Sequence, residues 1–77
     1  MTHGAYLQAI RDKSDELGII SDDVMDDFDA KELVTVLPTI TLEYVINNPN
    51  GVGPKHKWHE AWLSICQEEY MQRMLLL

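Results

Sequence analysis

The chain has 77 residues, of which 45% are hydrophobic and 25% charged, and its net charge is −7. A chain of this length and composition forms one globular domain, so we treat residues 1–77 as a single unit with a thin core. No stretch approaches the roughly 20 apolar residues of a membrane helix, and no signal-peptide pattern is present, which excludes membrane contact from the expected functions.

The single cysteine, Cys66, excludes a disulfide within the chain. This suits a reducing compartment, because small secreted domains usually depend on disulfides. We therefore expect a cytoplasmic protein.

The negative charge is concentrated in the first 32 residues, which carry nine acidic and three basic side chains, against four and three in residues 33–77. A field of this sign repels phosphate backbones, so we expect no direct binding to nucleic acid and favour a basic protein surface as partner. The densest part of this region forms a predicted binding patch, which we call the acidic patch: Asp22, Asp23, Asp26, Asp27 and Asp29.

The first predicted helix covers about residues 2–17. Tyr6, Ile10 and Leu17 recur at helical spacing near one face. Gly18 follows, and glycine readily adopts the left-handed conformation that commonly ends a helix.

A short second helix is predicted over about residues 21–28. Ser21 is a favourable N-cap, and the aspartates of the first turn suit the helix dipole. Val24, Met25 and Phe28 are expected to anchor this helix to the core.

A third helix is predicted over about residues 30–47. Asp29 and Glu32 have the spacing of a capping box, which places its start near Ala30. Residues 33–46 also alternate like a strand, but nothing else in the chain offers a strand to pair with, so we favour a helix bent at Pro38.

The last predicted helix covers about residues 54–75, after a loop rich in Asn, Gly and Pro. Two apolar rows run along it. The first comprises Trp58, Ala61, Trp62 and Ile65. The second, which we call the apolar seam, has spacings of 3, 4, 4 and 3 like a coiled coil and comprises Leu63, Cys66, Tyr70, Met74 and Leu77. Either both rows face the chain's own core, or one of them docks on a partner or on a second copy.

These elements predict an all-α fold, a small bundle of three to four helices, with an α+β fold containing residues 33–46 as a strand as the alternative. No catalytic motif is present. A small metalloenzyme is disfavoured, because His56 and His59 form only a pair and Cys66 lies about 10 Å further along the helix. We therefore expect no catalytic residue, no metal and no cofactor.

A candidate anion or salt-bridge site lies at the predicted start of the last helix, where Lys55, His56 and Lys57 follow two glycines. Positive charges oppose the dipole of a helix N-terminus, so we expect the acidic patch to compensate them.

The sequence therefore favours a non-enzymatic protein-interaction module, an adaptor, inhibitor or assembly subunit, that binds a basic or apolar protein surface. A second copy of the chain, in a homo-oligomer, is one such partner. One alternative is an acidic DNA mimic that blocks a nucleic-acid-binding protein, and another is a viral structural or accessory subunit.

Overall fold

The computed structural model describes residues 1–19, 25–49 and 59–76. Within these ranges it contains helices and no strand. The helices are α1 (His3–Leu17), α2 (Asp27–Val36), α3 (Thr39–Asn47) and α5 (Trp62–Leu75). The predicted all-α fold is confirmed, and the strand alternative for residues 33–46 is wrong because those residues lie in α2 and α3 and the turn between them.

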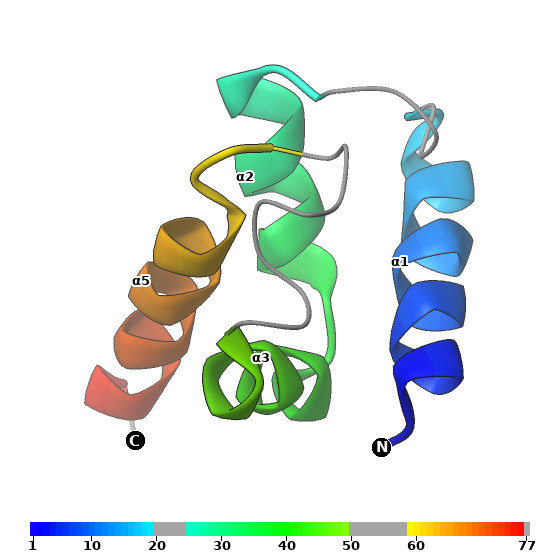
Figure 1. Cartoon of the computed structure of the whole chain (residues 1–77). Coiled ribbons are helices and arrows are strands. Elements are labelled where there is room, and N and C mark those ends of the chain that lie inside the picture. Colours follow the sequence, from blue (N-terminus) through cyan, green and yellow to red (C-terminus); the bar gives the residue numbers. More distant parts are fainter. Residues whose placement is uncertain (20–24, 50–58, 77) are drawn as a thin grey trace.

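The helices pack around α2, which lies between α1 and α5 in Figure 1. The shorter α3 lies below α2 and between the lower parts of α1 and α5, and both α2 and α3 contact α1 and α5. In this view α2 and α5 run in the same direction, and the first and last described residues lie at the same end of the molecule.

The first helix agrees with its prediction to within one residue. Thr2 is its N-cap, and the Thr2 hydroxyl accepts a hydrogen bond from the Ala5 amide at 3.1 Å. Gly18 ends the helix with a φ of 74°. Only glycine adopts this conformation without strain, and it lets the Ile19 amide bond back to the Ser14 carbonyl at 2.8 Å.

The start of α2 corrects two predictions. Asp26, rather than Asp29, is the N-cap: its carboxylate accepts a hydrogen bond from the Asp29 amide at 2.7 Å. The helix therefore begins three residues before Ala30. Residues 20–24 lie outside the described part, and of the predicted helix 21–28 the remainder is two non-helical residues followed by the first turn of α2.

Two apolar residues near the start of α2 differ in how far they are buried. Met25 is buried as predicted, whereas Phe28 is 73% exposed, so its predicted role as a core anchor is wrong. The reason is the register of α2: moving the N-cap to Asp26 puts Phe28 on the outer side of the first turn.

Pro38 separates α2 from α3, where the sequence predicted one bent helix over residues 30–47. Proline disfavours the helical conformation of the residue before it, and Leu37 accordingly has an extended ψ of 144°. Pro38 then serves as the N-cap of α3. The chain therefore changes direction at this point.

The last helix begins later than predicted. Residues 54–58 lie outside the described part, and residues 59–61 form a turn before α5 starts at Trp62. Its end at Leu75 agrees with the prediction.

The core gathers apolar side chains from each of the described helices and from the residues flanking α2. Its buried members are Tyr6, Ile10, Met25, Ala30, Leu33, Val34, Leu37, Leu42, Val45, Trp62 and Cys66.

Two buried hydroxyls in this interior, those of Ser14 and Thr41, have no hydrogen-bond partner among the described residues. Because a buried hydroxyl without a partner has lost its water hydrogen bonds, we expect Ser14→Ala and Thr41→Val each to raise the free energy of unfolding by about 1 kcal/mol. Urea denaturation followed by circular dichroism measures this change. A decrease in stability in both variants would contradict the expectation.

Candidate functional site

The last two turns of α5 expose a group of large apolar side chains. Their exposed fractions are 63% for Met71, 41% for Met74, 79% for Leu75 and 86% for Leu76. We call these four residues the apolar end of α5. A small protein rarely exposes such a cluster without a contact to cover it, whereas single exposed residues such as Phe28 are ordinary.

The apolar seam is divided between the core and this surface. Cys66 is fully buried, and Leu63 and Tyr70 pack partly buried against the core, but Met74 is exposed. Leu77 lies outside the described residues. The first apolar row is less exposed: Trp62 is buried, Ala61 and Ile65 are partly buried, and Trp58 is not among the described residues.

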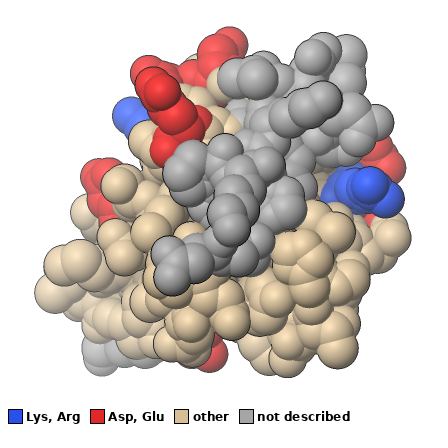
Figure 2. All heavy atoms as spheres, viewed as in Figure 1, with Lys and Arg blue, Asp and Glu red and all other residues tan. Residues whose placement is uncertain are grey.

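The described part of the acidic patch lies at the start of α2. Asp26 caps this helix and Asp29 lies in its first turn. Asp22 and Asp23 fall outside the described residues. On the face shown in Figure 2 acidic side chains gather toward the upper left, whereas the lower part, where α3 and the end of α5 lie in Figure 1, is largely uncharged.

His59 connects the starts of α2 and α5. Its Nδ1 accepts a hydrogen bond from the Ala61 amide at 3.0 Å. In a neutral imidazole the proton then lies on Nε2, which donates to the Asp27 carboxylate at 2.5 Å. Both ring nitrogens are therefore engaged in structural hydrogen bonds.

Most of the residues considered for a metal or anion site lie outside the described part of the chain. Lys55, His56 and Lys57 are not among the described residues. In the ranges that the structure does describe, no group of three or more His, Cys, Asp or Glu side chains is arranged to hold a metal ion.

A shallow groove of about 210 Å³ runs between α2 and α5. The buried Val34 and the partly buried Ile65 supply its apolar residues. Its polar lining comprises Lys31, Thr35, Glu68, Glu69 and Gln72.

Arg73 bridges α5 and α2 near their C-terminal ends. Its guanidinium donates to the carbonyls of Val34 at 3.2 Å and Thr35 at 3.0 Å, and to the hydroxyl of Thr39 at 3.1 Å. Carbonyls in the last turn of a helix lack intrahelical donors and carry partial negative charge, so a cation there is favourable. Arg73 thus joins α5 to the end of α2 and the start of α3.

Arg73 was not identified as a site residue from the sequence, and the pairing of Asp27, a member of the acidic patch, with His59 was not predicted either. For Arg73 one signal was present: it is a lone base among apolar residues, and α2 carries no basic residue in its own last turn. No local pattern marks the pairing of His59 with Asp27, because 32 residues separate them.

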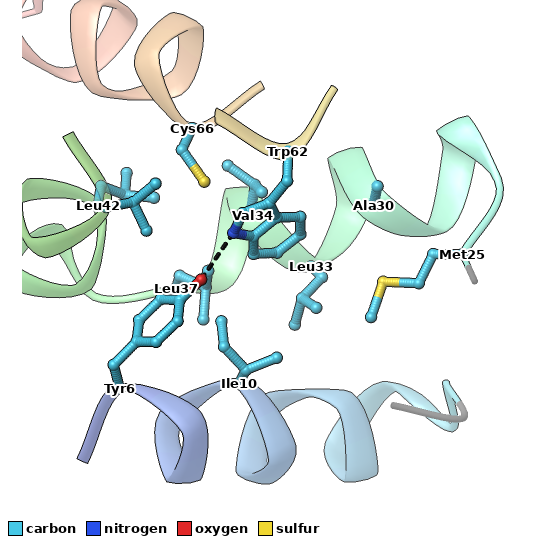
Figure 3. Packing of buried hydrophobic residues seen from close by; sticks show 11 residues of the cluster. Tyr6, Ile10, Met25, Ala30, Leu33, Val34, Leu37, Leu42, Trp62 and Cys66 are labelled. Atoms are coloured by element: carbon cyan, nitrogen blue, oxygen red, sulfur yellow. Dashed lines mark hydrogen bonds between the residues drawn. The ribbon is translucent and has the colours of Figure 1, made fainter. Parts of the chain in front are cut away.

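The centre of the core contains a polar contact, shown in Figure 3. The indole N–H of Trp62 donates to the Tyr6 hydroxyl at 2.8 Å. Burial raises the pKa of Tyr6, and it raises the pKa of Cys66 to about 12. A thiol held neutral in this way is a poor nucleophile at neutral pH.

These shifts predict a loss of stability in alkali. Both groups have a higher pKa in the folded state than in the unfolded one, so their contribution is complete below the unfolded values and is lost as pH rises. For Cys66 the affected range begins near its ordinary pKa of 9.0. We expect the free energy of unfolding to fall by about 1 kcal/mol more between pH 8 and pH 10 than in Cys66→Ala, as measured by urea denaturation. Equal slopes in the two proteins would contradict this.

The chain matches no protein-family model, and no curated protein or solved structure is significantly similar to it. Among the helices described, none is long and apolar enough to cross a membrane.

Proposed function

We propose that this chain is a small helical protein-interaction module, and that the apolar end of α5 is its contact surface. The observation that carries the proposal is the exposure of four large apolar side chains within two helical turns, from Met71 to Leu76. Removing such side chains from water on a partner releases roughly 25 cal/mol for each Å² of apolar area that is buried. No catalysis is part of the proposal.

The geometry favours this apolar surface over the acidic patch as the main contact. Asp26 caps α2, and Asp27 pairs with His59, so these two carboxylates already stabilise the fold. The acidic patch instead suits a supporting electrostatic role, steering a basic partner toward the module.

Capture of partners from a native lysate, followed by mass spectrometry, tests the proposal when a matched pair of variants is included. Leu75→Glu/Leu76→Glu places two charges in the proposed surface. Gly4→Glu/Ala5→Glu adds the same charge to the exposed first turn of α1, where a side chain at Gly4 meets no neighbour.

We expect the proteins captured by the wild type and by the α1 variant to be lost from the α5 variant, because a buried unpaired carboxylate disfavours an apolar interface. Circular dichroism checks that both variants are folded. Capture of the same proteins by all three would refute the proposal.

A further inference from the structure

Leu75 of the apolar end lies on the same stripe of α5 as residues that line the groove. Ile65, Glu68, Gln72 and Leu75 follow one another at spacings of 3, 4 and 3 residues, which keeps them on one side of α5. We call these four residues the outer stripe. The first three line the groove, and Leu75 is 79% exposed beyond its end.

The outer stripe is complementary to itself when its direction is reversed. Its spacing reads the same from either end, so two antiparallel copies of α5 place Ile65 opposite Leu75 of the other copy. The same alignment places Glu68 opposite Gln72, where the carboxylate accepts a hydrogen bond from the amide. Each apolar residue of the stripe thus packs against an apolar residue of the other copy, and each polar residue forms a hydrogen bond with a polar one.

A two-fold interface requires this kind of match, because the same patch serves both partners. The groove between α2 and α5 adds a surface against which a side chain of the other copy can pack. In this alignment Leu75 of each copy lies at the level of Ile65 in the other, beside the apolar residues Val34 and Ile65 that line the groove between α2 and α5. The long stem of Lys31 lies on the same lining and can cover an apolar neighbour.

We propose that a second copy of this chain occupies the groove, with the two α5 helices packed antiparallel about a two-fold axis through the outer stripe. The inference rests on the proposed function and names the partner of that surface. A standard stable interface covers about 800 Å² per partner, and four helical layers lie at the small end of this range. We therefore expect a concentration-dependent dimer with a Kd in the micromolar range, strengthened by added salt because each copy carries a net charge of −7.

Sedimentation equilibrium of the full chain over roughly 5 to 500 µM, with reductant present, measures the mass directly. We expect the wild type to rise from one chain to two. Ile65→Lys and Leu75→Glu should each stay monomeric, since each puts a charge against an apolar residue in both layers of its own dimer. An equimolar mixture of the two variants should recover the dimer, because the introduced lysine and the introduced glutamate meet in one layer and the native Ile65–Leu75 pair fills the other.

A second comparison avoids the partly buried Ile65. Glu68→Leu/Gln72→Leu changes only exposed positions and makes the stripe apolar throughout, so the dimer should tighten at least tenfold without forming larger species. Gln8→Leu/Asp12→Leu makes the equivalent change on exposed α1 and should leave the mass unchanged.

A wild type that remains monomeric over the whole concentration range would overturn the self-pairing. So would an equimolar mixture of Ile65→Lys and Leu75→Glu that stays monomeric. The same would follow if Glu68→Leu/Gln72→Leu and Gln8→Leu/Asp12→Leu changed the dimer affinity equally. The proposed function is tested separately. A monomeric wild type whose captured partners are lost on Leu75→Glu/Leu76→Glu refutes the second copy as occupant and leaves the interaction module intact, whereas a dimer without any α5-dependent foreign partner supports self-pairing alone.

Discussion

Trp62→Ala is expected to lower the free energy of unfolding by several kcal/mol. Trp62 is the largest fully buried side chain among the described residues, and it lies where α1, α2 and α5 meet around the core (Figure 3). Removing a buried tryptophan costs about 3–5 kcal/mol, since the apolar contacts are lost and a cavity remains. A domain of this size has a total stability of about 4–11 kcal/mol, so one substitution removes a large share of it.

Circular dichroism at 222 nm and urea denaturation measure this effect. Leu76→Ala is the matched control, because Leu76 is 86% exposed and its truncation removes few contacts. Its free energy of unfolding should stay within about 0.5 kcal/mol of the wild type. A Trp62→Ala protein as stable as the control would mean that this core is not the one that holds the chain together.

The hydrogen bond at Trp62 contributes separately from its volume. Tyr6→Phe keeps the ring but removes the hydroxyl that accepts the hydrogen bond from the indole N–H, so we expect a loss of about 1–2 kcal/mol. A double-mutant cycle with Trp62→Phe isolates the coupling between the two side chains. Strictly additive effects would show that this contact adds nothing to stability.

The fold was predictable where the signals were local. Thr2 and Gly18 lie next to α1 in sequence, and their capping roles follow from residue type alone. The start of α2 was misplaced because Asp26 and Asp29 are equally good N-caps by residue type. The choice between them depends on tertiary contacts such as the burial of Met25.

The region around Pro38 shows a different limit. The sequence placed a disruption there, but a bent helix and two separate helices have nearly the same pattern. Packing decides between them: Leu37 is buried, and α3 contacts both α1 and α5. The local preference of a residue before proline for extended backbone then becomes the end of α2.

The candidate site was predictable only in part. The surplus of apolar residues at the end of the chain is visible in the sequence, whereas the exposure of Leu75 and Leu76 is seen only in the structure. The sequence does not predict which members of the apolar seam point into the core, because this depends on where α3 crosses α5. The polar contacts between α3 and α5, Tyr70 to Glu43 and Arg73 to Thr39, join residues 27 and 34 positions apart, and no spacing rule connects such distant residues.

Arg73→Ala is expected to cost about 2 kcal/mol and to loosen the end of α5. The side chain is only 21% exposed, and its guanidinium makes three hydrogen bonds, two to carbonyls in the last turn of α2 and one to the Thr39 hydroxyl at the start of α3. Hydrogen bonds that involve a charged group are stronger than neutral ones, and the loss leaves the Val34 and Thr35 carbonyls without this donor. Urea denaturation measures the stability, and hydrogen exchange should quicken at the end of α2 and in the last turns of α5.

Two further variants separate the possible causes of this loss. Arg73→Lys keeps the charge but not the planar fork, so it should recover less than half of the lost stability. Glu69→Gln removes only the ion pair to Arg73 at 3.7 Å and should cost less than about 0.5 kcal/mol. If Arg73→Lys were as stable as the wild type, charge alone would explain the effect. If the fork is required, Arg73 is the residue that holds Leu75 and Leu76 in a fixed position against the bundle, which a specific contact surface at the end of α5 needs.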